Sequence, residues 1–123
     1  YGLYTTPGGW GSGVTIADST VMGIKTVTTT PYTLALLDMG YGIAMNLAGA
    51  NQVTVPTNAS VPVPIGSWVR VGQYGAGQTT IAAAGGVTIR SKSGWTKIAA
   101  QYGEVFLRKV GTDEWWLSGD LSA

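Results

Sequence analysis

The chain has 123 residues, a net charge of +1 and no run of like charges, which excludes the basic surface typical of nucleic-acid-binding proteins. Cysteine and histidine are both absent, so disulfides, thiolate or imidazole metal sites and the usual Ser/His and Cys/His catalytic pairs are excluded as well. The length suits one hydrophobic core, and 19 glycines with abundant Val, Thr, Tyr and Trp favour an all-β domain.

The first 13 residues contain five glycines and one proline among Tyr1, Tyr4 and Trp10. Such a composition does not form a regular element, so we expect an arm over residues 1–13, either a flexible leader or packed against another subunit. No basic stretch followed by an apolar one indicates a signal peptide. The longest uncharged apolar stretch, residues 39–50, is shorter than the roughly 20 residues of a spanning helix, and we expect no membrane span.

Residues 14–123 are predicted to form a single β-sandwich domain, because stretches rich in β-branched and aromatic residues recur at roughly ten-residue spacing. Tyr32–Asp38 fits a short buried helix or a strand, and its composition favours a strand with Gly42–Leu47 as its hairpin partner. Val61–Pro64, with alternating prolines, is expected at an edge or in a polyproline-like segment. The other predicted strands are Val14–Ala17, Met22–Thr29, Asn51–Val55, Trp95–Ala99, Glu104–Val110 and Trp115–Ser118, with three more at the centre.

The centre of the predicted domain is a three-stranded antiparallel meander. Residues 68–74 alternate between a Val/Gln face and a face that carries Trp68 and Tyr74. Loop 75–78 is predicted to fold the chain back into Thr79–Ala83, and a second reversal leads into Val87–Arg90. Four glycines are expected to hold turn geometry without a ligand role, namely Gly75, Gly77, Gly85 and Gly86.

These elements predict an all-β fold, either an antiparallel β-sandwich or a jelly-roll-like domain, with the Gly/aromatic arm at its N-terminus. The triplets Val-Thr-Ile at 14–16, Val-Thr-Val at 53–55 and Val-Thr-Ile at 87–89 recur at uneven spacing. A β-helical stack is therefore the minor alternative.

The carboxylates do not suggest an active site. Asp113 and Glu114 are adjacent but fall in a predicted hairpin turn, and only Glu104 with Asp120 offers another pair. A glycosidase needs two carboxylates about 5–10 Å apart across a cleft, which this pair would meet only by accident of folding. We predict no enzymatic activity, no catalytic residue, no cofactor and no metal.

The aromatic side chains are the remaining candidates for function. They fit core packing, an interface between subunits, or stacking against sugar rings. In Trp115-Trp116 the two rings must point to opposite faces of a strand, so one is expected in the core and the other exposed. Tyr102 was weighed with the candidates for an interface or a glycan platform, which are Tyr4, Trp10, Trp68, Tyr74, Trp95 and Trp116.

Four stretches carry a resemblance to a known kind of protein. They are Val53–Pro56, Val63–Gly66, Tyr74–Gln78 with Ala82–Ile89, and Val110–Trp115 continuing to Gly119–Leu121. From about Thr33 to its end the chain resembles a β-rich module of tailed-bacteriophage virion proteins, including tail fibres and other exposed structural components. The resemblance is a pattern of turns and strands, and it covers roughly three quarters of the chain.

The resemblance implies a non-enzymatic virion protein on the particle surface, in a tail fibre, a head fibre or a capsid decoration. It also implies an oligomer, expected to be a homotrimer, in contact with other virion proteins. The alternative is a carbohydrate-binding domain that recognises a host surface glycan. A mean hydropathy of +0.20 with thirteen charged residues independently indicates association through apolar patches, with the arm and Val61–Pro64 as contact regions.

Overall fold

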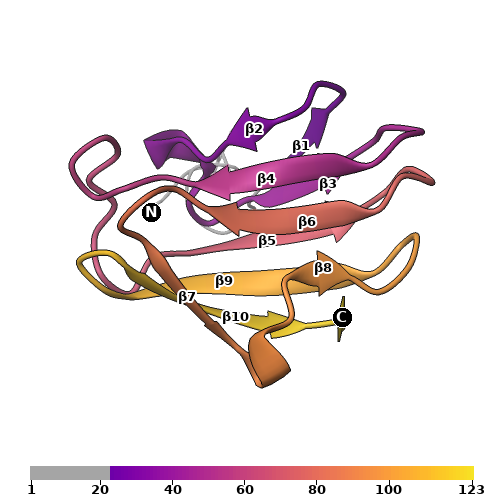
Figure 1. Cartoon of the computed structure of the whole chain (residues 1–123). Coiled ribbons are helices and arrows are strands. Elements are labelled where there is room, and N and C mark those ends of the chain that lie inside the picture. The colour runs from indigo at the N-terminus through magenta and orange to yellow at the C-terminus, as the bar shows by residue number, and fades with distance from the viewer. Residues whose placement is uncertain (1–22) are drawn as a thin grey trace, which may run out of the picture.

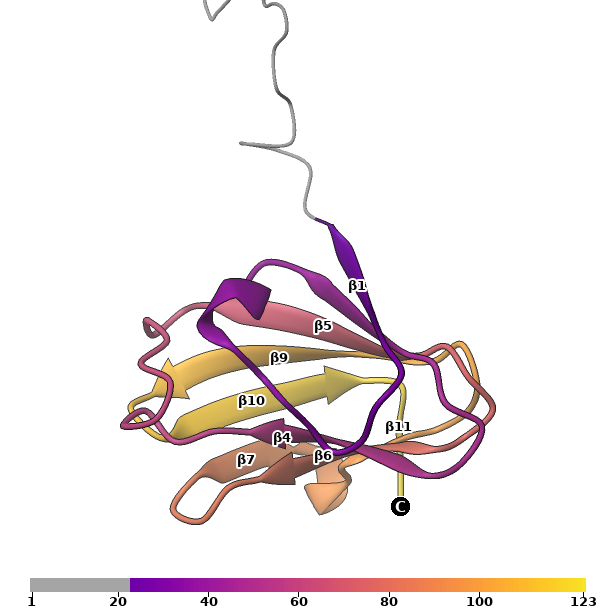
Figure 2. The same ribbon diagram turned by 90° about the horizontal axis from the view of Figure 1, so that it is seen from above.

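The computed structural model describes residues 23–123, which form two β-sheets packed face to face (Figures 1 and 2). Sheet A has the spatial order β1 (Ile24–Val27), β3 (Gly42–Met45), β5 (Trp68–Gln73), β9 (Glu104–Gly111), β10 (Glu114–Gly119) and β7 (Thr88–Ser91). Sheet B has the order β11 (Leu121–Ser122), β8 (Lys97–Ile98), β6 (Thr79–Ala83), β4 (Asn51–Val55) and β2 (Tyr32–Thr33). The all-β sandwich is confirmed, whereas the predicted arm and the strand at 14–17 lie outside the described residues.

The core lies between the sheets and follows the alternation of side chains along each strand. Val69 and Val71 of β5 point inward, as the period-two pattern predicts, and both are fully buried. Trp115 is buried and Trp116 is exposed, as expected for neighbours on one strand. The largest buried apolar side chains facing these residues are Ile43, Met45, Val53, Val55, Ile81, Ile98, Leu107 and Leu117.

From β1 to β6 the chain is a coil that alternates between the sheets. β1, β3 and β5 pair in parallel in sheet A, and β2, β4 and β6 pair in parallel in sheet B. Gly42 lies opposite Arg70 and Asn51 opposite Thr79, a step of 28 residues in each sheet. Each turn of the coil thus adds one strand to both sheets, which is the arrangement of the β-helical alternative.

The predicted antiparallel meander is therefore wrong. β5 and β6 lie in different sheets, and β5 pairs with β3 and β9. Period-two alternation identifies a strand but not its partner, and the glycine-rich loop crosses between sheets instead of reversing within one. Both sheets are mixed, so the sandwich is not antiparallel throughout, and a jelly-roll order of strands is not found.

Gly75 and Gly77 are needed for a reason other than turn geometry. The arcs that follow β3 and β5 are stacked, with the amides of Gly75 and Gly77 donating to the carbonyls of Met45 and Leu47 at 3.0 Å. Neither glycine has a positive φ, but a Cβ on Gly77 would overlap the carbonyl oxygen of Gly49. The expectation of turn geometry holds for the Gly85-Gly86 reversal, where Gly86 has φ +92° and Val87 N donates to Ala84 O.

The C-terminal part follows its prediction more closely. β9 and β10 form an antiparallel hairpin across Thr112 and Asp113, and β7 adds to β10 in parallel at the edge. Tyr32–Asp38 was predicted wrongly as a strand with a hairpin partner: β2 contains only its first two residues, and Leu36–Asp38 is the 3-10 helix η2. A second 3-10 helix, η3 (Lys92–Gly94), precedes β8. Among residues 23–123 no helix is long and apolar enough to cross a membrane.

Candidate functional site

The outward side chains of β5, β9 and β10 form one surface, which we call the aromatic face. The register places Trp68 opposite Arg108 and Arg108 opposite Trp116, while Arg70 lies opposite Phe106. Strand alternation leaves these residues no place in the core, so they lie side by side on the outside of sheet A. The aromatic face consists of Trp68, Arg70, Tyr74, Tyr102, Glu104, Phe106, Arg108 and Trp116.

Aromatic rings and guanidinium groups support one another at the middle of this face. The rings of Trp68 and Phe106 are stacked, with centroids 5.6 Å apart and planes inclined by 22°. The guanidinium carbons of Arg70 and Arg108 lie 5.5 and 5.4 Å from the centre of the Phe106 ring. Trp116 is 58% exposed and lines, with Phe106 and Arg108, a hollow of about 220 Å³.

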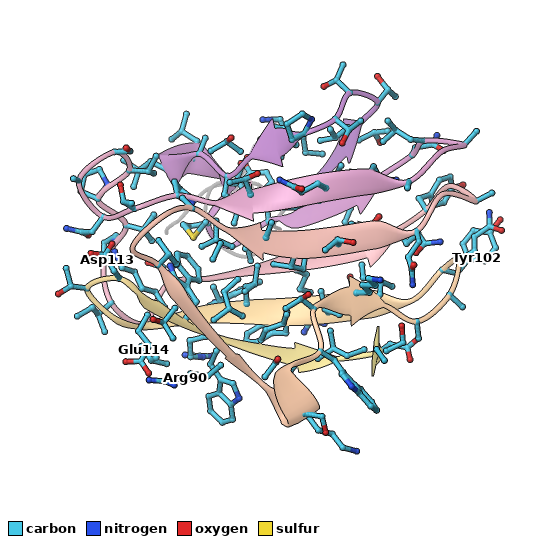
Figure 3. All side chains as sticks on the ribbon, viewed as in Figure 1. Arg90, Tyr102, Asp113 and Glu114 are labelled. Carbon is cyan, nitrogen blue, oxygen red and sulfur yellow. The ribbon has the colours of Figure 1, made fainter. Side chains whose placement is uncertain are left out.

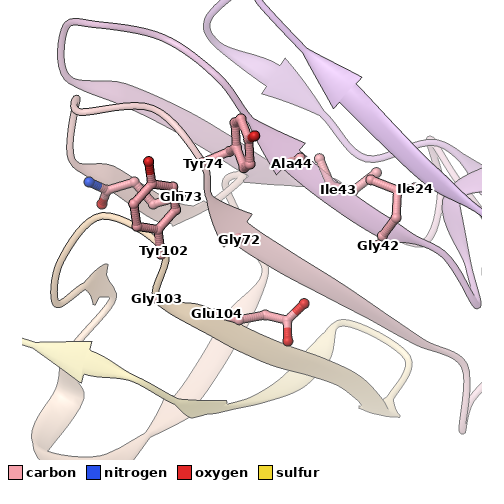
Figure 4. A pocket seen from close by; sticks show the side chains of 10 residues that line it. All are labelled: Ile24, Gly42, Ile43, Ala44, Gly72, Gln73, Tyr74, Tyr102, Gly103 and Glu104. Carbon is pink, nitrogen blue, oxygen red and sulfur yellow. The ribbon is translucent and has the colours of Figure 1, made fainter.

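A larger groove of about 320 Å³ lies at the end of the aromatic face towards β3. Its floor consists of small residues, Gly42, Ala44, Gly72 and Gly103, contributed by β3, β5 and the approach to β9. In Figure 4, Tyr74 and Tyr102 stand at one end of the groove, Ile24 at the other, and Glu104 along one side. The groove exists because three neighbouring strands present almost no side chain at this point.

Tyr102 is held in an unusual backbone conformation at the rim of the groove. Its φ is +70°, a region that is uncommon for a bulky residue and costs about 1–3 kcal/mol. The amide of Tyr102 donates to Gln73 O at 2.6 Å, which fixes the loop against β5. The side chain is nevertheless 72% exposed, and its ring meets Tyr74 edge to face at 5.8 Å.

The charged groups of the aromatic face form only weak pairs. Arg70 lies 3.5 Å from Glu104, and Arg90 lies 2.9 Å from Glu114, with all four side chains well exposed. Figure 3 shows Arg90 and Glu114 at the opposite end of the sandwich from Tyr102. Exposed pairs of this kind contribute at most about 1 kcal/mol, so the charges remain available to a polar ligand.

The structure brings together three of the predicted site residues. Trp68, Tyr74 and Trp116 all lie on the aromatic face. Trp95 does not; it follows η3 on the way to sheet B, with the Lys92 ammonium 5.9 Å from its ring. Tyr4 and Trp10, also predicted as interface or glycan residues, lie outside the described residues.

Phe106 was missed as a site residue. The alternation of β9 puts it on the same side as Glu104 and Arg108, so its outward direction was readable from the sequence. Its contact with Trp68 was not readable, because it depends on the pairing of β5 with β9 across more than thirty residues of chain. The carboxylate pair considered for glycoside hydrolysis does not share the groove, since Glu104 lines it and Asp120 does not.

Two polar clusters lie away from the aromatic face. Asp38 is buried and accepts hydrogen bonds from the Tyr32 hydroxyl at 2.6 Å, from Ala35 N at 2.8 Å and from Lys25 Nζ at 3.3 Å. The hydrogen bond from Lys25 to the Tyr32 hydroxyl, with attraction by Asp38, raises the pKa of Lys25. Burial, together with the bond to Asp38, raises the pKa of Tyr32. This cluster ties β1 of sheet A to β2 of sheet B.

The second cluster is centred on Lys109, which points inward from β9 and is only 2% exposed. Its ammonium donates to Asn58 Oδ1 at 2.6 Å and to Val63 O at 2.7 Å. The backbone amide of Asn58 in turn donates to Asp113 Oδ1 at 2.7 Å. These bonds fix the long loop between β4 and β5 against the β9–β10 hairpin. Within residues 23–123, no group of three or more Asp or Glu side chains is arranged to hold a metal ion.

Comparison with protein-family models finds no match to the chain, and comparisons with curated proteins and with solved structures find none either.

Proposed function

We propose that the chain is a non-enzymatic structural module of a tailed-bacteriophage virion, exposed on the particle surface in a tail fibre, a head fibre or a capsid decoration. The observation that carries the proposal is where the resembling stretches fall. Tyr74–Gln78 is the arc whose glycines stack on the preceding turn of the coil, and Val110–Trp115 is the turn of the β9–β10 hairpin. The resemblance thus concerns residues that build this fold.

An assembly of identical copies, expected to be a trimer, is part of the proposal. Large apolar side chains are exposed at Ile24, Leu37 and Ile65, of which Leu37 is 86% exposed. Ile65 follows the proline-rich segment 61–64, whose Pro62 and Pro64 are exposed as well. Contacts with further copies or with other virion proteins would remove this apolar surface from water.

Purified particles provide the test. Phage particles from a culture of the source organism are banded in a density gradient and digested, and peptides of this chain are sought by mass spectrometry. We expect the peptides in the particle band together with those of tail or capsid proteins. Their recovery only from the soluble cell fraction would contradict a virion role, and sedimentation equilibrium of the purified chain gives the number of copies.

The second candidate function is recognition of a host surface glycan, and the aromatic face is the observation that favours it. Exposed rings beside paired charges and a small groove are typical of sites that bind sugars through stacking and hydrogen bonds. A glycan array of bacterial envelope polysaccharides tests this candidate. Binding by the wild-type chain that is lost with Trp116→Ala or Tyr74→Ala is expected, and no signal at millimolar sugar leaves the structural role alone.

A further inference from the structure

We propose that the groove beside Tyr74 and Tyr102 binds one neutral hexopyranose ring of a glycan. This inference rests on the glycan-binding candidate above and adds to it the place of binding and the class of sugar. The first observation is the floor of the groove. Gly72 has no positive φ, and a Cβ built on it would meet no atom closer than 3.7 Å. Neither the backbone nor packing requires glycine here, and its consequence is an open space.

The two tyrosines provide the second observation. Tyr74 and Tyr102 are 57% and 72% exposed, and each is held by the other in an edge-to-face contact. Tyr102 has its left-handed backbone on a loop fastened at both sides, by its own amide to Gln73 O and by Gln101 Nε2 to Tyr74 O at 3.2 Å. An exposed aromatic ring held in a strained conformation is typical of a ligand site, since the core gains nothing from it.

Charge indicates which sugars fit. Among the described residues that line the groove, Glu104 alone carries a formal charge. Its carboxylate accepts hydrogen bonds from sugar hydroxyl groups, whereas an anionic sugar would place a second negative charge beside it. The apolar face of a pyranose ring matches the tyrosine end, so the groove suits glucose-, galactose- or N-acetylhexosamine-type rings and not uronic or sialic acids.

The size of the groove favours a sugar over a protein partner. A volume of about 320 Å³ is near the lower end of the roughly 300–1,000 Å³ that small-molecule sites occupy. A stable protein interface needs about 800 Å² on each partner, far more than the floor and two rims of this groove present. The occupant is therefore a single ring, with the rest of the glycan extending over the aromatic face.

The experiment is a titration of the full ¹⁵N-labelled chain followed by NMR. The probes are methyl β-D-glucopyranoside, methyl β-D-galactopyranoside, N-acetyl-D-glucosamine and, as the anionic control, D-glucuronate, each raised to millimolar concentration. We expect saturable shifts of the Gly72, Tyr102 and Gly103 amides with at least one neutral sugar. Under the same conditions glucuronate should shift them at least tenfold more weakly.

Two variants separate a binding role from a structural one. Gly72→Val fills the groove while suiting a strand, so it should abolish the shifts and keep the spectrum of a folded protein. Its matched control is Thr80→Val, an outward position of β6 on sheet B, which should bind like wild type. Tyr102→Gly relieves the positive φ, so it should lose binding without a lower melting temperature; a lower melting temperature with binding retained would overturn the assignment.

The outcomes distinguish this inference from the candidate on which it rests. Shifts confined to the hollow of Phe106, Arg108 and Trp116 would keep glycan binding and overturn the groove. Equal binding of glucuronate would overturn the choice of neutral sugars. No shift with any probe overturns the groove as a hexopyranose site, whereas the recovery of the chain from particles tests the virion role independently.

Discussion

The outer faces of the two sheets differ in chemistry although the same strand alternation produces both. The outer face of sheet A carries aromatic rings, arginines, a carboxylate and a glycine floor. The outer face of sheet B carries small or flexible polar side chains, among them Gln52, Thr54, Thr80, Ala82 and Lys97. Because the fold depends on the inward residues, outward positions vary freely, and an aromatic set on one face only indicates that this face contacts something.

The neighbouring tryptophans test the contrast between inward and outward positions most strongly. Trp115→Ala should lower the free energy of unfolding by about 3–5 kcal/mol, because a fully buried indole leaves a cavity between the sheets. Trp116→Ala should change it by about 0.5 kcal/mol, since the ring is largely exposed. Urea unfolding followed by circular dichroism measures both. Equal losses for the two variants would mean that the aromatic face is part of the folding core.

The stacked arcs hold the strands of both sheets in register, and Gly77→Val should disturb them. Its Cβ would overlap the carbonyl of Gly49, so we expect a loss of about 3 kcal/mol from overpacking against the backbone. Gly85→Val is the matched control: Gly85 has no positive φ and no atom within 4 Å of a built Cβ, and its change should stay near about 0.5 kcal/mol. Melting temperatures of the two variants would show whether stacking, rather than glycine content, matters.

Lys109 and Arg108 compare the two directions at adjacent residues of one strand. Lys109→Met keeps most of the packing but leaves Asn58 Oδ1 and Val63 O without their donor, which should cost about 2 kcal/mol. Arg108→Met should cost about 0.5 kcal/mol and weaken any glycan signal on the array. Chemical denaturation and the array are to be run on the same preparations; a stable Lys109→Met protein would argue against the loop being fixed by this ammonium.

The smallest effect concerns the cluster that joins the two sheets at β1 and β2. Tyr32 and Lys25 both have raised pKa values, so the stability they contribute is fully present below pH 10.0, the ordinary pKa of tyrosine. That contribution is lost as the pH rises through the folded-state values above it. Melting temperature should therefore fall above about pH 10, and less steeply in Tyr32→Phe. Identical slopes for the two proteins would remove this cluster from the account.

The direction of side chains was predictable from the sequence, and the pairing of strands was not. Trp68 and Tyr74 were placed correctly on one face because alternation is a local property. The partner of β5 was missed because parallel pairing joins residues 28 positions apart, with no turn signal to mark it. Gly77 shows the same limit: a glycine that avoids a neighbouring backbone looks, in the sequence, like a glycine that turns the chain.

The candidate site was predictable to a similar degree. The list of aromatic residues contained Trp68, Tyr74 and Trp116, and the register of β5, β9 and β10 brings them to one face. Nothing local marks Gly72 as the floor of a groove or Tyr102 as a residue with positive φ. Both depend on how loops and strands distant in the chain are packed.

The 28-residue step of the coil sets a rule for the lengths of chain that the fold accepts. A segment of 28 residues copied between β4 and β5 would supply one new strand to each sheet, and the β9–β10 hairpin would still find an edge of the same kind. A shorter insertion has no strand to offer and must leave the sandwich as a surface loop. Variation by tandem duplication is thus open to this architecture in whole turns, and each turn would lengthen the outer faces without remaking the core.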